Sequence, residues 1–152
     1  MVAQPPVTNL ARKFGLNILA EPEDFGGAYP TTPIASRVSF INEKRDTVRK
    51  FMKALVEGVH VYKTPKNFSK KVIAKYVKVN DSEVLEDSYR FFSRLLPIKP
   101  YPTIEGIKEA LAELGEKDPK VRAARPEDFA DMSLVRELDG SGFIDGLYKG
   151  KR

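Results

Sequence analysis

The chain has 152 residues and a formal net charge of +5, and its 41% hydrophobic and 31% charged residues are typical of a globular protein rather than a disordered one. It contains no cysteine, which excludes disulfide bonds, thiolate metal sites and a cysteine nucleophile. No apolar run approaches the roughly 18 residues needed to span a bilayer, and the first residues, MVAQPPVTNLARKF, lack the basic start and apolar centre of a signal peptide.

A helix is predicted at the start of the chain. Pro5 and Pro6 suit its first turn, where a missing backbone N–H costs nothing, and Gly15 is a suitable C-terminal stop. The apolar residues between them recur at helical spacing: Val7, Leu10, Ala11 and Phe14. The next segment, residues 17–20 (NILA), is a short apolar run and predicts a strand.

Residues 21–33 are predicted to form a loop because they contain three prolines, two adjacent glycines and several acidic residues. Residues 34–41 alternate partly between apolar and polar side chains. This pattern predicts a second short strand that passes into a helical turn.

The most regular pattern in the chain lies between residues 46 and 62. Apolar side chains there recur every three or four residues and form one wide stripe: Val48, Phe51, Met52, Leu55, Val56, Val59 and Tyr62. A long amphipathic helix is the expected structure. A stripe of this width usually packs against a sheet or against several other helices.

Capping signals place the remaining helices. Thr64 is expected to cap the next helix, Asn80 with Glu83 resembles a capping box, and Thr103 precedes a helix that Gly115 ends. The polar stretch 116–125 then leads to the last predicted helix, near 131–138. The chain is thus expected to hold five or six helices and only two short strands.

Four stretches occur in a recognisable order: the Pro-Pro helix start followed by ARKFGLNILAE, then YPTTPIASRVSFI, DTVRKFMKALVEGVHVYKT and SLVRELDGSGFIDGLY. Together they cover nearly all of residues 4–148. In this order they resemble the C-terminal half of bacterial ABC-transporter substrate-binding proteins of the nitrate, sulfonate and taurine-binding type. That group shares its fold with the thiamine-pyrimidine synthases.

The resemblance implies a helix-rich α/β chain with part of a type II periplasmic-binding-protein fold. Proteins of this family hold a ligand between two α/β lobes that crossing strands connect. Residues 1–30 would be a remnant of the second lobe and the approach to the hinge, residues 31–148 the C-terminal portion of the first lobe, and residues 149–152 a basic tail. The parallel strands of the first lobe and most of the second lobe would be missing.

Family ligands are mostly small anions or small polar molecules, which implies two groups of ligand-binding candidates. One group lies at the start of the first helix, where backbone N–H groups favour negative charge, and the other lies in the loop before the returning segment. The candidates are Pro6, Thr8 and Asn9, and Tyr29, Thr31 and Thr32. Purely structural roles, as a helix start and as a proline-bounded loop, are favoured for both groups.

No residue pattern indicates catalysis or a metal. His60 is the single histidine and lies at the border of the apolar stripe, so a packing or surface role is expected. The carboxylate pairs Glu21 with Glu23 and Glu127 with Asp128 suit capping and helix-dipole roles. Because no nucleophile–base set, phosphate loop or metal-ligand spacing occurs, no catalytic residue, metal or cofactor is predicted.

The sequence therefore predicts a solute-binding component of an ABC import system, as a truncated copy with little ligand affinity alone. Its partners would be a small-molecule ligand, once the missing lobe is supplied, and the ABC permease of the full-length family. Self-association would hide uncovered helix faces. A nucleic-acid partner is not predicted, since the basic cluster 63–71 is better explained as a solvated helix face, and neither is membrane insertion.

Two alternatives stay open. A stand-alone helical interaction protein would be a compact monomer without exposed apolar surface. A thiamine-pyrimidine synthase-like enzyme ranks lower, because those enzymes depend on a cysteine-rich motif and histidines, whereas this chain has no cysteine and one histidine. The expected location is periplasmic for the family, and cytoplasmic if Met1 is the true start.

Overall fold

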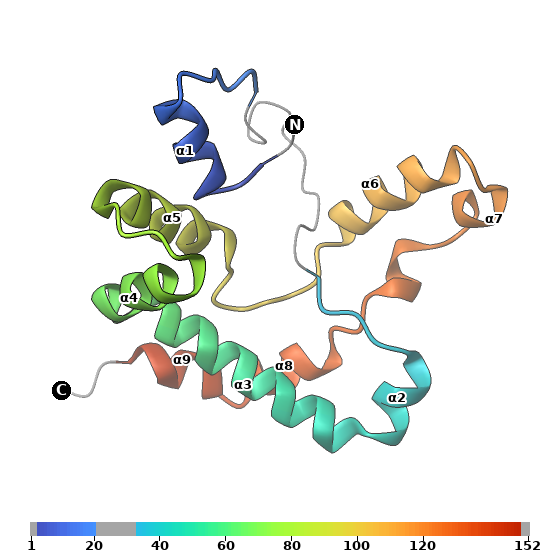
Figure 1. The fold of residues 1–152 in the computed structure, drawn as a ribbon. Helices are drawn as coiled ribbons and strands as arrows, with labels where there is room; N and C mark the ends of the chain where they lie inside the picture. The colour runs from blue at the N-terminus through green and yellow to red at the C-terminus, as the bar shows by residue number, and fades with distance from the viewer. Residues whose placement is uncertain (1–2, 21–32, 150–152) are drawn as a thin grey trace.

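All regular secondary structure in the part of the chain that the structure describes is helical (Figure 1). The structure is a computed structural model that describes residues 3–20 and 33–149, and no strand occurs in these two ranges. The elements in chain order are α1 (Val7–Lys13), α2 (Val38–Glu43), α3 (Arg45–Lys63), α4 (Lys66–Val77), α5 (Ser82–Leu95), α6 (Ile104–Gly115), α7 (Pro119–Arg122), the 3₁₀ helix η2 (Pro126–Phe129), α8 (Ser133–Gly140) and α9 (Phe143–Tyr148).

The expected α/β fold is wrong for the described residues. Residues 17–20 have no regular structure, and Leu19 is 96% exposed. Residues 34–37 are also irregular, and the helical turn expected near them is α2, which begins at Val38. A strand needs a neighbouring strand to satisfy its backbone N–H and C=O groups, and the described residues offer none. The partial type II periplasmic-binding-protein fold, which needs a sheet, is therefore contradicted.

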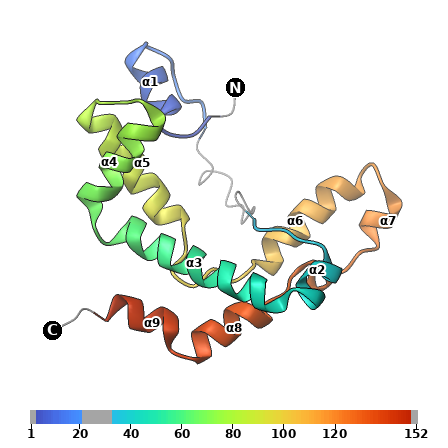
Figure 2. The same cartoon turned by 60° about the horizontal axis from the view of Figure 1, so that its bottom comes forward.

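Helix α3 is the centre of the molecule, as the wide stripe predicts. It contacts α2, α4, α8 and α9, and Figure 2 shows α8 and α9 running along its underside. The main core cluster joins Val56 of α3 to Leu138 of α8 and Ile144 of α9, with Met52, Phe143 and Leu147 packed around it. Phe51 of the same stripe stays 49% exposed. Helices α8 and α9 thus cover the part of the stripe around Val56, and the part around Phe51 stays exposed to solvent.

Helices α4 and α5 form an antiparallel pair at one end of α3, and α1 packs on α5. The Ser69 hydroxyl donates to the Tyr62 carbonyl oxygen at 2.7 Å, which fixes α4 against the end of α3. On the other side of the pair, the Asn9 side-chain amide donates to the Asp87 carboxylate at 2.7 Å. These polar contacts order α1, α4 and α5 around a small apolar interior that includes Val84 and Leu85.

The N-cap of α5 is Asp81 rather than Asn80. Its Oδ1 accepts the backbone N–H groups of Glu83 at 3.0 Å and Val84 at 3.1 Å. The predicted capping box of Asn80 with Glu83 therefore does not form, because the neighbouring Asp81 is an equally good cap and the third helical position is then Val84. Thr64 also does not cap α4. Its hydroxyl donates to the His60 carbonyl oxygen at 2.7 Å and so closes the end of α3.

Glu86 of α5 gives a prediction about pH. It pairs with Lys66 at 2.6 Å and Lys70 at 3.1 Å, and the hydrogen bonds from these two lysines lower the pKa of Glu86 to about 2. A carboxyl group whose folded pKa lies below its unfolded value stabilises the fold above the unfolded pKa and loses that contribution as pH falls. We expect Glu86→Gln to lower the free energy of unfolding at pH 6.5, and the difference from the wild type to shrink between about pH 5 and pH 2.

Urea unfolding at pH 6.5 and at pH 2.5 would measure this difference. Glu109→Gln is the matched control, because Glu109 is exposed on α6 and has no ion pair in the described structure. A difference between Glu86→Gln and the wild type that is the same at both pH values would contradict the prediction.

Helices α6 and α7 and the 3₁₀ helix η2 form an arm that leaves the rest of the fold. They pack mainly on one another and make no comparable contact with α1, α4 or α5, and both views show the arm projecting away from these helices (Figures 1 and 2). The chain exposes 11333 Å² of surface, whereas a compact globular protein of 17.1 kDa exposes about 7,700 Å². The arrangement is therefore open.

Candidate functional site

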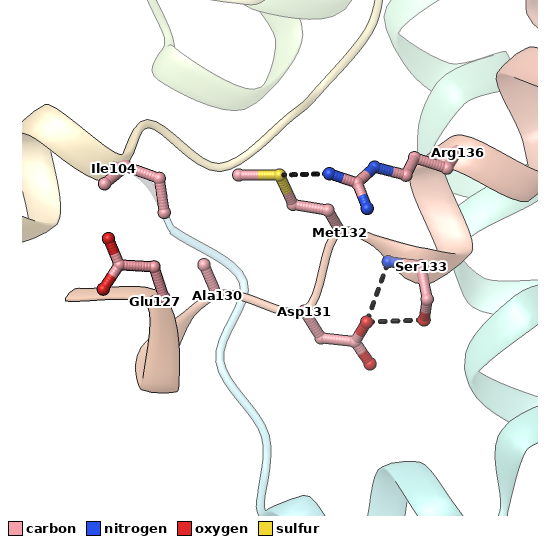
Figure 3. Close-up of a pocket in the computed structure, with 7 residues that line it drawn as sticks. All are labelled: Ile104, Glu127, Ala130, Asp131, Met132, Ser133 and Arg136. Carbon is pink, nitrogen blue, oxygen red and sulfur yellow. Dashed lines mark hydrogen bonds between the residues drawn. The ribbon is translucent and has the colours of Figure 1, made fainter. Parts of the chain in front are cut away.

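A hollow of about 440 Å³ lies where the start of α6, η2 and the start of α8 meet (Figure 3). We call it the α6–α8 hollow. This volume falls within the range of small-molecule sites. The residues that line the hollow are Ile104, Glu127, Ala130, Asp131, Met132, Ser133 and Arg136.

One carboxylate of the hollow, that of Asp131, bonds to the first residue of α8. Asp131 Oδ1 accepts the backbone N–H of Ser133 at 2.8 Å and also the Ser133 hydroxyl. Both hydrogen bonds lower the pKa of Asp131, the one from the hydroxyl more strongly. Arg45 of α3 donates to the Ser133 hydroxyl oxygen at 3.0 Å. Asp131 and Ser133 therefore hold the start of α8 in place. Any ligand in the hollow would have to bind to other polar side chains.

The remaining charged groups of the hollow are Arg136 and Glu127. The guanidinium of Arg136 points toward Met132 and donates to its sulfur at 3.6 Å, while Glu127 lies beside Ile104 on the opposite side (Figure 3). Sulfur is a weak acceptor. No ion pair joins Arg136 or Glu127 to another described residue. The arrangement can offer a donor fork to a small anion and an acceptor to a small cation.

A smaller hollow of about 160 Å³ lies between α1 and α5. Asn9 lines it and is only 8% exposed, and its Oδ1 has no hydrogen-bond partner in the described structure. Lys13 closes one side by pairing with Asp81 and, at 3.5 Å, with Glu83. The hydrogen bond to Asp81 is the main reason why the pKa of Lys13 is raised. Most of the polar groups around this hollow therefore already bond to one another.

The structure describes only the first of the two groups of predicted ligand-binding residues. Pro6 is the N-cap residue of α1 and makes no side-chain cap bond, and the Thr8 backbone N–H donates to the Gln4 carbonyl oxygen at 3.4 Å. Of that group, Asn9 alone lines one of the two hollows. The second group lies outside the described residues: Tyr29, Thr31 and Thr32.

Arg136 and Glu127 were not predicted as ligand-binding residues. Arg136 lies on a short helix among other charged residues, a pattern that indicates a solvated face. Glu127 precedes Asp128 in a way that favours a role at the start of a helix. Both side chains line the same hollow because residues 130–132 connect η2 to α8 along its wall and η2 packs on α6, and no spacing in the sequence reports this arrangement.

His60 packs inside the fold. Its ring meets the Tyr148 ring edge-on, with centroids 4.7 Å apart and an interplanar angle of 88°. This contact agrees with the predicted packing role. Within residues 3–20 and 33–149, no group of three or more His, Asp or Glu side chains is arranged to hold a metal ion. No helix there is long and apolar enough to cross a membrane.

The described residues define an open chain whose regular elements are all helical and which contains the two hollows described above. Comparison with protein-family models, with curated proteins and with solved structures gives no match. The resemblance to ABC-transporter substrate-binding proteins therefore stays a prediction, without support from these comparisons.

Proposed function

We propose that this chain is a helical module that covers a partner scaffold through uncovered apolar segments. The observation that supports the proposal is large apolar side chains in open solvent. After α1 they are Phe14, Leu16 and Leu19, and around the start of α2 they are Ile34, Val38 and Phe40. Leu19 is 96% exposed and Val38 is 69% exposed, whereas large apolar side chains in a packed core are almost fully buried.

The open arrangement supports the same proposal. Its surface of 11333 Å² exceeds that of a compact chain of the same mass by about half. A stand-alone interaction protein would be compact and would hide such segments. A module that packs on another chain would expose these apolar segments in its unbound state and bury them in the complex.

Dye binding and size-exclusion chromatography test this proposal. The wild type is expected to bind a hydrophobic dye and to elute ahead of a compact standard of its mass. Replacing Phe14 and Leu19 by serine is expected to lower the dye signal and to reduce self-association. A matched pair of exposed lysines on the arm, Lys108 and Lys117, replaced by serine, serves as the control. Elution as a compact monomer without dye binding would reject the proposal.

A second candidate function is the predicted one, a solute-binding component of an import system. The α6–α8 hollow supports it, because the Arg136 guanidinium has only a weak sulfur acceptor and the Glu127 carboxylate has no ion pair in the described structure. Ile104, Ala130 and Met132 add an apolar wall. A small molecule with a sulfonate or carboxylate at one end and an amine at the other, such as taurine, matches this charge pattern.

Isothermal titration with taurine, nitrate and alkyl sulfonates tests this second candidate. Because the hollow is shallow and open, we expect binding of taurine no tighter than about 1 mM. Arg136→Gln should abolish the binding, whereas Arg94→Gln, an exposed arginine of α5, should leave it unchanged. Equal heats for both variants would exclude Arg136 as the anchor.

A further inference from the structure

Helix α4 (Lys66–Val77) has an outer face that no other described element covers. Its inner side is fixed by Ser69, which bonds to Tyr62, and by Lys66 and Lys70, which both pair with Glu86 of α5. Helices α3 and α5 are its packing partners, and both views place α4 at the outer edge of the fold (Figures 1 and 2). The outer face is therefore held rigid from behind.

The outer face carries an apolar stripe. Phe68, Val72 and Tyr76 recur every four residues, so they lie in one row along the helix. Phe68 is 54% exposed and Tyr76 is 75% exposed. Phe and Tyr are residue types that suit the boundary between water and the lipid headgroups.

Lysines border this stripe. Lys71 and Lys75 lie at one edge, and Lys78 follows as the C-cap residue. None of the three forms an ion pair with a described residue, although the Lys75 ammonium lies 5.5 Å from the centroid of the Tyr76 ring. Between residues 58 and 80 the sequence contains six lysines and no acidic residue. On the inner side Lys66 and Lys70 share the single negative charge of Glu86, whereas Lys71, Lys75 and Lys78 add three positive charges without an ion-pair partner on the outer face.

We propose that this α4 outer face, made of Phe68, Val72, Tyr76, Lys71, Lys75 and Lys78, binds the surface of a membrane that contains anionic lipids. The apolar stripe enters the headgroup region, and the lysines lie next to the anionic groups of the lipids. The contact is peripheral, since α4 stays packed on α3 and α5. The proposal rests on α4 alone and is independent of the partner scaffold proposed above.

The chemistry of the face favours lipid over other anionic partners. A nucleic acid would pair with the lysines but leave the row Phe68, Val72 and Tyr76 in water. The face contains no arginine, which is the residue of choice for bidentate recognition of nucleic-acid phosphates and bases. An acidic protein would need a groove that fits an outward-facing helix, whereas a membrane surface adapts to it.

Co-sedimentation with vesicles tests the proposal. The full chain is mixed with vesicles of phosphatidylcholine alone, or with about 30 mol% phosphatidylserine, at low and at physiological salt. Each lysine near an anionic surface contributes about fivefold to binding, so replacing Lys71, Lys75 and Lys78 by glutamine should weaken binding about 100-fold. Replacing Phe68 and Tyr76 by serine should weaken it about tenfold or more.

The matched control removes the same charge elsewhere. Lys108, Lys117 and Lys120 are exposed on the α6–α7 arm, and replacing them by glutamine should change binding less than about twofold. All variants alter exposed side chains, and circular dichroism checks that the helix content of each one is unchanged.

Three results would overturn the proposal. One is equal binding to neutral and anionic vesicles, and another is an equal loss in the two lysine triples, which would indicate bulk charge. The third is displacement by soluble polyglutamate together with no effect of the Phe68 and Tyr76 replacements, which would indicate an acidic macromolecule.

Discussion

Replacing Ile144 by alanine is expected to lower the free energy of unfolding by about 2–5 kcal/mol. Ile144 of α9 is 0% exposed and packs with Val56 of α3 and Leu138 of α8, so it joins the consecutive helices α8 and α9 to α3, which is distant in the sequence. Truncation removes buried apolar area and leaves a cavity that the rigid helices around it only partly fill. An open fold has few other clusters to compensate the loss.

Urea unfolding followed by far-ultraviolet circular dichroism measures the effect. Val61→Ala is the matched control, because Val61 lies on α3 but is exposed, and alanine is a better helix former. We expect that control to differ from the wild type by less than about 0.5 kcal/mol. If Ile144→Ala does not fold, Ile144→Val, with an expected loss of about 0.5–1.5 kcal/mol, tests the same contact. A change in Ile144→Ala no larger than in Val61→Ala would mean that α9 does not pack on α3 in solution.

The helices were predictable because their signals are local. The stripe from Val48 to Tyr62 predicts a long amphipathic helix, and α3 (Arg45–Lys63) confirms it. Gly15 was expected to end the first helix, and it follows Lys13 and Phe14 with a φ of +78°, a conformation that glycine adopts without strain. Periodicity and stop signals lie within a few residues of each other, so a single sequence contains them.

The strands failed because their signal is incomplete without a partner. Residues 17–20 are apolar enough for a strand, but a strand exists only in a sheet, and no segment of the described chain pairs with them. Helix α9 was missed for a different reason. Gly142 and Gly146 flank only a few apolar residues, and the helix gains its stability from Ile144 packing in the core rather than from propensity.

The candidate site shows the same limit. Asn9 was singled out for its place at a helix start, yet the feature that distinguishes it in the structure is its bond to Asp87, 78 residues away in the chain. Arg136 and Glu127 line opposite sides of the α6–α8 hollow because η2 packs on α6 and residues 130–132 lead from it to α8. Such pairings depend on how helices pack, and neither spacing nor composition records them.

Two glycine-to-alanine substitutions are expected to have opposite signs. A Cβ at Gly115 would lie 3.0 Å from Arg122 Cα and 3.1 Å from the Arg122 backbone nitrogen, so it would push α7 away from the end of α6. We expect Gly115→Ala to destabilise the α6–α7 contact by about 1–3 kcal/mol. Gly58 lies inside α3 with no atom within 4 Å of such a Cβ. Gly58→Ala should therefore stabilise the fold by about 0.5–1 kcal/mol, because alanine favours the helix.

The two effects need different measurements, since the arm and the core are separate parts of the fold. Gly58→Ala should raise the urea midpoint of the whole chain. Gly115→Ala should instead speed hydrogen exchange at amides in residues 104–122, while exchange in α3 stays as in the wild type. This local response follows because α6 and α7 pack mainly on each other and on η2. Unchanged exchange across the arm in Gly115→Ala would mean that Gly115 does not pack closely against Arg122 in solution. Faster exchange in α3 would mean that the arm supports the core.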